Sequence, residues 1–459
     1  MNLREVVLDK KPILYLLIEI KARELEGRTL LALEAASRGF RVVVGHKEHI
    51  SKGLWSGLLP PGIYFDKSLT RGKEKKLGKV LDNGCLLVSQ DEEAGLLNYS
   101  YDKFISIRST SETVSMAKSI FCWGKHEYKS WIKYYPNSSH KMHLTGSPRI
   151  DYWRQDFQRY FETHIDSIKK RFGEFVLVSS NFTQANSYMT VNERIERAKR
   201  IGAICNKKDE ETKRKSIEDR KKLFNYFIGL IDYVSDRFEN IQFLVRPHPA
   251  EKISGWKSNL PVKDNIKIVF EGGISPWVHA SSAVLHNACT TGIEAYVAGI
   301  PTLAYIPFPS DRSGKIPNKL SINCTNKEQV SEVLSMVING ESVNEHRTPE
   351  NDQLIRNRLA NVNGDTAAKR IVDVLATLDV PKAPPIKSGI GGWKMEAKTE
   401  IRRFLNKIYN IETKSMRKFS GLKLQELKQI QNNLAAVTNK YMECEIKHLY
   451  GDVFVVEKP

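Results

Sequence analysis

Residues 285–295 read LHNACTTGIEA, and GIPT follows at 299–302. The pattern predicts an apolar strand that stops near Leu285, a Thr-Thr-Gly turn, and a helix that begins at this turn. The first N–H groups of a helix have no partner inside the helix, and ligands of an open parallel sheet lie outside the carboxyl ends of its strands. The stretch therefore predicts an α/β unit with an anion site at Thr290, Thr291 and Gly292, and with Glu294 near ribose hydroxyls. An ordinary helix with Thr290 as its N-cap is the alternative.

A second strand end carries a basic motif, because residues 241–249 read IQFLVRPHP. Pro247 and Pro249 stiffen the loop and hold His248 extended at the carboxyl end of the predicted strand. Arg246 offers a planar fork of donors, and a protonated His donates from either ring nitrogen. The motif predicts a phosphate site, with a structural loop and a surface His as the alternative.

Carboxylates follow two further predicted strands. Residues 84–90 read GCLLVSQ and are followed by Asp91, Glu92 and Glu93. Like charges held close together resist simultaneous ionisation, so one of the three could keep a raised pKa and act as a base or an acid. Glu24 lies in the segment KAREL at 21–25, directly after the first predicted strand. A solvated helix start, and an Arg23–Glu24 pair, are the alternatives.

Composition predicts a large soluble enzyme of a reducing compartment. The chain has 459 residues, 41% of them hydrophobic, with no stretch apolar enough to span a bilayer and no signal peptide, so we expect it in the cytoplasm. The 6 cysteines show neither zinc spacing nor a disulfide framework, and Cys289 is best read as a small buried thiol. No Asp-x-Asp motif lies near a strand end, so we expect no essential metal and no cofactor other than a substrate.

The formal net charge of +18 predicts an anionic partner. Nucleic acid is the least favoured one, because no recognised nucleic-acid-binding motif is present. Basic residues are concentrated after Trp393 and alternate with apolar ones at helical spacing: Lys394, Lys398, Arg402, Arg403, Lys407, Lys414, Arg417, Lys418 and Lys423 with Ile401, Phe404, Leu405 and Ile408. Such a helix can lie on an anionic membrane, pair with a partner, or pack on its own domain.

Strands and helices alternate along the chain in the way that produces parallel sheets. Strands are expected near residues 13–20, 41–44, 62–65, 85–89, 119–123, 142–145, 175–179, 242–245, 266–270, 283–285 and 302–306. The turn at 146–151 predicts a boundary between domains at 1–150 and 151–380. A Pro- and Gly-rich linker is expected at 381–392 and a basic helical tail at 393–459.

The motifs together resemble the bacterial surface carbohydrate biosynthesis protein family. The resemblance covers about residues 12–378 and uses Arg246-Pro247-His248-Pro249, Trp256, Pro276-Trp277, His286-Asn287 and Cys289-Thr290-Thr291-Gly292 with Glu294-Ala295, and in the first half KAREL at 21–25, Gly45-His46-Lys47 and Asp91-Glu92-Glu93. It implies the GT-B architecture, with two doubly wound Rossmann-like domains facing each other across a cleft. It also implies a role in making lipopolysaccharide O-antigen, capsule or a related glycan.

More distant relatives of that family use CMP-activated acidic sugars, which favours a glycosyltransferase with a CMP-linked ulosonic donor of the Kdo or sialic acid kind. In that interpretation domain 151–380 binds the nucleotide sugar: Arg246, His248, Thr290 and Thr291 hold the phosphate, and Asn181 and Asn287 line the site. Domain 1–150 binds a glycan or lipid-linked glycan acceptor. Glu92 or Glu93, and less readily Asp91 or Glu24, would be the catalytic carboxylate, in an inverting or a retaining reaction.

Three other functions stay open. The His-Pro motif is also similar to that of transferases of polyol phosphates from CDP-linked donors. A sugar-nucleotide epimerase shares the architecture and would act on the donor alone, and a non-catalytic scaffold of glycan assembly would keep the fold without needing His248 or Glu92. The expected location is the cytoplasm, with peripheral attachment to the inner face of the plasma membrane through the tail.

Overall fold

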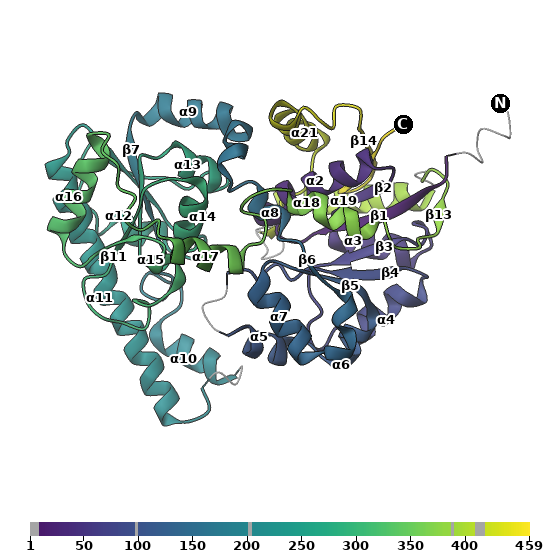
Figure 1. Ribbon diagram of the computed structural model, residues 1–459, viewed down its shortest axis with the longest axis horizontal. Coiled ribbons are helices and arrows are strands. Elements are labelled where there is room, and N and C mark those ends of the chain that lie inside the picture. The colour runs from purple at the N-terminus through teal and green to yellow at the C-terminus, as the bar shows by residue number, and fades with distance from the viewer. Residues whose placement is uncertain (1–8, 97–99, 201–203, 387–389, 409–417) are drawn as a thin grey trace. The chain divides into compact units, whose positions relative to one another are not determined.

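The computed structural model describes residues 9–96, 100–200, 204–386, 390–408 and 418–459, with the backbone alone for 390 and 402–408. The chain divides into two compact units, of which unit 1 contains residues 1–160 and 353–459 and unit 2 contains residues 161–352 (Figure 1). In each unit helices flank a largely parallel sheet. The prediction of two doubly wound α/β domains is therefore confirmed.

The sheet of unit 1 has nine strands among the described residues, in the order β14-β15-β2-β1-β3-β4-β5-β6, with β13 paired to β1. The strands from β1 to β6 run parallel, whereas β15 is antiparallel to β2. Six consecutive buried residues in β1 explain its unbroken apolar run, since helices cover both faces of such a sheet. The strands are β1 (Lys11–Ile18), β2 (Arg41–His46), β3 (Ile63–Asp66), β4 (Leu86–Ser89), β5 (Ala117–Cys122), β6 (Met142–Leu144), β13 (Lys382–Ala383), β14 (Glu445–Tyr450) and β15 (Val453–Glu457).

The helices of unit 1 come from both ends of the chain. They are α2 (Lys21–Ser37), α3 (Lys47–Trp55), α4 (Glu74–Asp82), α5 (Tyr101–Arg108), α6 (Ser111–Met116), α7 (Lys125–Tyr134), α8 (Pro148–Asp151), α18 (Ala367–Leu375), α19 (Ile390–Ile408) and α21 (Leu424–Thr438). The turns η1 (Pro136–Lys141) and η2 (Gln155–Phe161) are 3₁₀ helices.

Residues 353–380 pack with unit 1, although the sequence pattern grouped them with 151–352. The buried carboxylate of Asp151 accepts the N–H groups of Ala367 and Ala368 at 2.9 and 3.3 Å, so it holds the first turn of α18. The same carboxylate accepts Asn361 at 2.7 Å. Because a helix start needs acceptors for its free N–H groups, this carboxylate places α18 beside α8.

The sheet of unit 2 is parallel throughout, in the order β12-β11-β10-β7-β8-β9. Its strands are β7 (Phe175–Ser179), β8 (Gln242–Arg246), β9 (Ile266–Ile268), β10 (Ala283–His286), β11 (Thr302–Tyr305) and β12 (Ile322–Cys324). The helices are α9 (Glu162–Phe172), α10 (Val191–Arg200), α11 (Lys207–Arg237), α12 (Ile253–Lys257), α13 (Ser275–Ala280), α14 (Thr291–Ala298), α15 (Ile316–Lys319) and α16 (Lys327–Ile338), and α17 (Pro349–Arg358) extends into unit 1. Leu223, Phe227 and Ile231 of α11 recur at helical spacing and join the buried core that also contains Trp256.

The C-terminal extension is helical in α19 and α21 and then ends in a hairpin of β14 and β15. Phe454 of β15 pairs with Val44 of β2, and both side chains are buried. The hairpin covers the β2 edge of the parallel strands, where unpaired backbone groups would otherwise be open to another chain. The predicted basic residues Lys414 and Arg417 lie outside the described residues, as do the side chains of Arg402, Arg403, Phe404, Leu405, Lys407 and Ile408.

Candidate functional site

The strand order of unit 2 places a topological switch point between β7 and β10. From β7 the chain moves outward through β8 to β9, and then returns to the other side of β7 with β10, β11 and β12. The loops after β7 and β10 therefore lead to strands on opposite sides of this point, and ligands of an open parallel sheet bind outside the carboxyl ends of its strands at such a point. The predicted residues Asn181, Asn287 and Thr290 all lie in these two loops.

The buried ring of His286, the last residue of β10, supports the loop that follows this strand. The ring bonds the Ser321 hydroxyl through Nε2 at 2.9 Å. A Cβ at Gly292 would lie 2.2 Å from this Nε2, so only glycine fits there. Burial and the nearby Arg312 lower the pKa of His286 to about 3, and the ring is therefore neutral.

The loop then turns sharply at Ala288, which has a φ of 49°. The Ala288 N–H donates to Asn318 Oδ1 at 2.6 Å, and its carbonyl accepts Asn181 Nδ2 at 3.1 Å. Asn287 Nδ2 donates to the Tyr305 carbonyl at 2.7 Å, whereas in the described part of the chain its buried Oδ1 has no partner. The predicted residues Asn181 and Asn287 thus fix the two loops to each other and to β11.

Arg312, which sequence patterns did not single out, lies buried beneath both loops. Its Nη1 donates to the Asn181 carbonyl at 3.2 Å, and its Nη2 donates to the carbonyls of Asn287 and Ala288 at 2.8 and 3.1 Å. Among the described residues no carboxylate lies within ion-pair distance of this guanidinium, and its buried Nε has no hydrogen-bond partner. Burial lowers the pKa of Arg312 to about 10, so it stays charged near neutral pH. Buried charges are ordinarily paired, and this one leaves positive charge beside the loops after β7 and β10.

The start of α14 adds free donors beside Arg312. The N–H groups of Gly292 and Ile293 are used by the carbonyls of Cys289 and Thr290. In the part of the chain that the structure describes, the N–H groups of Thr290 and Thr291 and the exposed Thr290 hydroxyl have no partner. Free N–H groups at a helix start can bind an anion.

The loop after β8 lies on the other side of β7. Arg246 donates to the carbonyls of Glu271 and Gly272 at 2.8 and 2.6 Å and lies over the Trp277 ring. Burial lowers the pKa of Arg246 to about 10. His248 is exposed, and its Nδ1 accepts the Ala250 N–H at 3.1 Å, which places the proton of the neutral ring on Nε2. Loss of surrounding water lowers the pKa of His248 below its ordinary value.

Glu251 and Glu294 are both engaged in the interior of unit 2. Glu251 accepts the Ser180 hydroxyl and the Phe182 N–H, each at 2.6 Å, and so ties the β7 loop to the segment after His248. Glu294, the predicted ribose ligand, is buried and accepts the Ser275 hydroxyl at 2.5 Å. A ribose hydroxyl would have to share Glu294 with Ser275.

The predicted catalytic carboxylates lie in unit 1, and each has a basic or N–H partner. Asp91 and Glu93 pair with Arg108 at 3.0 and 3.1 Å, and Glu92 pairs with the buried Arg28 at 2.9 Å. Burial raises the pKa of Asp91 to about 6, against the opposing effect of Arg108. Glu24 is buried and accepts the Glu19 N–H at 2.7 Å. Their catalytic role stays a prediction.

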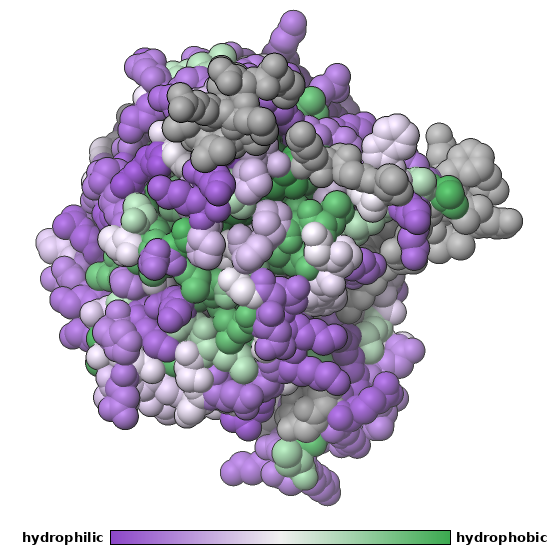
Figure 2. Space-filling view, turned by 90° about the vertical axis from the view of Figure 1, so that its right-hand side faces the viewer, coloured by the Kyte–Doolittle hydropathy of each residue, from purple (hydrophilic) through white to green (hydrophobic). Residues whose placement is uncertain are grey.

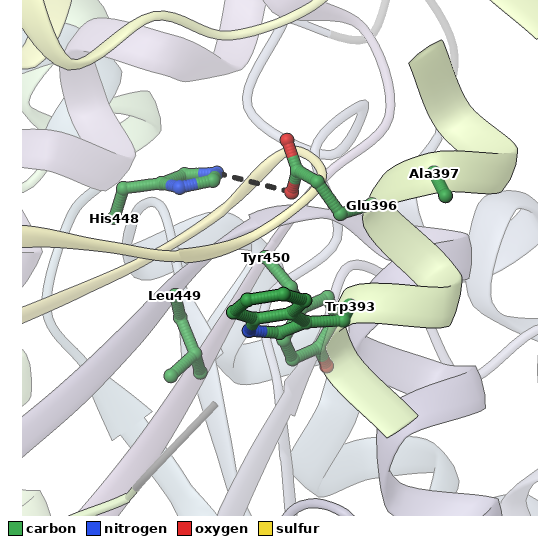
Figure 3. Close-up of a pocket in the computed structure, with 6 residues that line it drawn as sticks. All are labelled: Trp393, Glu396, Ala397, His448, Leu449 and Tyr450. Atoms are coloured by element: carbon green, nitrogen blue, oxygen red, sulfur yellow. Dashed lines mark ion pairs between the residues drawn. The ribbon is translucent and has the colours of Figure 1, made fainter. Parts of the chain in front are cut away.

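A pocket of about 460 Å³ lies elsewhere in unit 1, between α19 and β14 (Figure 3). It is lined by Trp393, Glu396, Ala397, His448, Leu449 and Tyr450, and His448 pairs with Glu396 at 3.6 Å. None of the predicted site residues lines it. Figure 2 shows the side of the molecule that lies to the right in Figure 1, where hydrophilic residues surround a central hydrophobic area.

The described residues show neither a metal centre nor a membrane-spanning helix. They contain no group of three or more His, Cys, Asp or Glu residues arranged to hold a metal ion. They also contain no helix with the length and apolar character needed to cross a bilayer.

No family model and no curated protein sequence matches this chain. Solved structures do match it in fold. A putative UDP-N-acetylglucosamine 2-epimerase from Listeria monocytogenes superposes with a TM-score of 0.50 and 15% identity, covering 81% of this chain and 98% of the other. The UDP-GlcNAc 2-epimerase from Neisseria meningitidis bound to UDP-GlcNAc superposes with a TM-score of 0.49 and 11% identity. The match covers 80% of this chain and 100% of the other. The wall teichoic acid polymerase TagF superposes with a TM-score of 0.46 and 9% identity. The match covers 80% of this chain and 87% of the other.

At such low identity the first of these matches speaks to the fold alone. The match over 81% of the chain and the strand orders described above together confirm the predicted fold class. The chain therefore has the two Rossmann-like domains of the GT-B type.

Proposed function

We propose that this chain is a nucleotide-sugar enzyme whose unit 2 binds the diphosphate of its substrate at the loops after β7 and β10. The observation that carries the proposal is the buried Arg312, whose charge meets no carboxylate among the described residues. The free N–H groups of Thr290 and Thr291 lie in the adjoining loop. A nucleoside diphosphate supplies the negative charge that this arrangement lacks.

The remaining roles in unit 2 follow from this placement. Nε2 of His248 and the Thr290 hydroxyl would donate to phosphate oxygens, and Glu294 would accept a ribose hydroxyl in exchange for Ser275. Gly292 leaves room for the His286 ring, because it has no Cβ, and this ring supports the loop. Asn181 and Asn287 hold the two loops at a constant separation.

Epimerisation of the sugar on its nucleotide is our first candidate reaction, because the fold match at a TM-score of 0.50 is a putative UDP-N-acetylglucosamine 2-epimerase. Such a reaction removes a proton from the sugar and returns one, and therefore needs a base. Asp91, with a pKa raised to about 6, is the base that we propose, ahead of Glu92, Glu93 and Glu24.

Glycosyl transfer to a glycan acceptor is the second candidate. It is favoured by the combination of Arg-Pro-His-Pro at 246–249 with Thr-Thr-Gly at 290–292, on which the resemblance to surface carbohydrate biosynthesis proteins rests. The donor in that case includes the CMP-linked ulosonic sugars. Peripheral contact with a membrane, through the C-terminal tail, is part of this second candidate.

Binding is tested by titrating UDP, UDP-GlcNAc, CMP, CDP, GDP and dTDP into wild-type protein and into two variants, His248→Ala and Thr290→Val. Loss of one charge-assisted hydrogen bond weakens binding by about 1.5–3 kcal/mol, so we expect a loss of roughly 10- to 100-fold in each variant. His164→Ala, an exposed His of α9, is the matched control and should bind as wild type does. Failure of every nucleotide to bind at millimolar concentration would overturn the proposal and leave the scaffold function.

The reaction is tested by incubating wild type and Asp91→Asn with the nucleotide sugar that binds, without any acceptor. Appearance of the sugar's epimer by proton NMR in wild type alone supports epimerisation. If the sugar nucleotide stays unchanged without an acceptor and is consumed only after a glycan acceptor is added, the result supports transfer instead. Transfer of polyol phosphate from a CDP-linked donor to an acceptor, with release of CMP, would identify the phosphotransferase alternative.

A further inference from the structure

A second cluster of charge lies at the switch point of the unit 1 sheet. There the switch point falls between β1 and β3, because β2 lies on one side of β1 and β3 to β6 lie on the other. Glu19 follows β1 and Lys47 follows β2, whereas Asp66 is the last residue of β3 and Lys67 follows it. Parallel strands present their carboxyl ends at one edge, so these side chains meet there.

Glu19 is surrounded by three ammonium groups. Its carboxylate lies 2.9 Å from Lys47, 2.8 Å from Lys67 and 3.2 Å from Lys418. The contacts with Lys67 and Lys47 hold the pKa of Glu19 far below its usual range despite partial burial. The side chains of Lys47 and Lys67 are each 18% exposed, so they are largely withdrawn from water yet still reachable.

Two more lysines, Lys73 at the N-cap of α4 and Lys76 within this helix, lie near Asp66. Lys73 lies 2.6 Å from the fully buried Asp66, and Lys76 interacts with Lys47, Lys73 and Asp66. A third carboxylate, Glu24, also interacts with Lys47, but it is paired with Arg23 at 3.5 Å. Five lysines thus face the two carboxylates of Glu19 and Asp66, which leaves an excess of three positive charges. Burial and the neighbouring ammonium groups of Lys47 and Lys73 lower the pKa of Lys76 to about 8, as expected where positive charge is in excess.

The C-terminal extension completes the cluster. Phe419, next to Lys418, packs on the His46 ring with centroids 4.4 Å apart. Lys21 at the start of α2 donates to the Gly421 carbonyl at 2.7 Å and pairs with Glu426 at 2.5 Å. These contacts fix the segment that carries Lys418 against the edge where β1 and β2 end.

We propose that Lys47, Lys67, Lys73, Lys76 and Lys418 form a second anion site that binds a phosphate group, with Glu19 occupying the site when no phosphate is present. An excess of three charges suits a phosphate dianion better than a single carboxylate, and lysine binds phosphate as a point charge. All five lysines belong to unit 1, and the proposal holds for either proposed reaction.

The test is calorimetric titration of glycerol phosphate into the full chain saturated with UDP, and into His248→Ala. We expect Lys47→Gln/Lys67→Gln to bind glycerol phosphate at least 10-fold more weakly than wild type, and Lys75→Gln, an exposed neighbour on α4, to bind as wild type does. Glu19→Gln should bind several-fold more tightly, because the phosphate no longer competes with a carboxylate. A merely structural cluster would not bind more tightly after this change.

Equal affinity in wild type and in the double variant, or no tightening in Glu19→Gln, would overturn the proposal. Binding that survives in His248→Ala separates this site from the nucleotide site, so either proposal can fail without the other. Sedimentation with vesicles of phosphatidylcholine, with and without phosphatidic acid, identifies the source of the phosphate. Lysine-dependent sedimentation with phosphatidic acid supports a lipid headgroup, and binding of glycerol phosphate alone supports a soluble ligand.

Discussion

Gly292 is a residue at which one added carbon would disturb the proposed nucleotide site. Its Cβ would lie 2.2 Å from Nε2 of His286, whose ring is buried and bonded to Ser321. Either the ring must move and lose this hydrogen bond, or α14 must shift away from β10. Both responses change the loop that contains Thr290 and Thr291.

We therefore expect Gly292→Ala to lower the free energy of unfolding by about 2–3 kcal/mol and to weaken nucleotide binding. Gly229→Ala is a control of opposite sign, because Gly229 is exposed in α11 with open space around it. Alanine is favoured over glycine by about 1 kcal/mol inside a helix, so this variant should be more stable. Urea denaturation measures both, and a Gly292→Ala protein as stable as wild type would show that the ring can yield.

Arg312 shows why one residue of the site was missed. It lies in the connection after β11 and belongs to no motif. Its role arises only because its guanidinium reaches the carbonyls of Asn181 and Asn287, which other strands carry. Whether an arginine is buried, and whether a carboxylate lies near it, depends on the folded structure and not on the order of residues.

The hairpin of β14 and β15 is the element that the sequence pattern did not reveal. It docks through β15 on β2, where Val453 pairs with Gly45. The Asp452 carbonyl would lie 2.0 Å from a Cβ at Gly45, so the close approach requires glycine. Arg41, which is fully buried, pairs with Glu457 at 2.7 Å and fixes the other end of the strand.

Gly45→Ala should therefore displace the hairpin and open the β2 edge. We expect faster proteolysis between residues 445 and 459 and a greater tendency to self-associate, because an unpaired strand edge can bind another chain. Limited proteolysis and size-exclusion chromatography measure these effects. Gly78→Ala in α4, where the space is open, should leave both unchanged.

The pH dependence of stability is a property of the whole chain that buried groups determine. Burial raises the pKa of Glu127 to about 8, and it lowers the pKa of His286 and His346 to about 3 and 4. The folded state binds the Glu127 proton more tightly than the unfolded state does, so this contribution to stability is lost as pH rises from about 4.5 to 8. The two histidines stay neutral in the folded state, so their contribution is lost as pH falls below about 6.5.

Where these ranges overlap, the two histidines add more stability with rising pH than Glu127 removes. We therefore expect the free energy of unfolding to be greatest near pH 6.5 and to fall by about 2 kcal/mol toward pH 8. Glu127→Gln should make the fall between pH 6.5 and pH 8 smaller, whatever its effect on stability at pH 6.5. Glu112→Gln, an exposed glutamate of α6, should leave the pH profile unchanged. An identical fall in Glu127→Gln and wild type would mean that Glu127 is ionised in the folded protein.

The sequence by itself determined the two parallel α/β units, because apolar runs, turn residues and helical spacing are local and repeat along the chain. It also identified the strand ends that carry Arg246, His248 and Thr290, since polar residues after a buried strand are visible in the order of residues. Only the tertiary structure decided that Asp91, Glu92 and Glu93 pair with arginines, that Arg312 lacks such a partner among the described residues, and that Lys418 joins Glu19. The physical reason is that the charge of a site depends on side chains from distant segments, and only the packing of those segments brings them within a few ångströms.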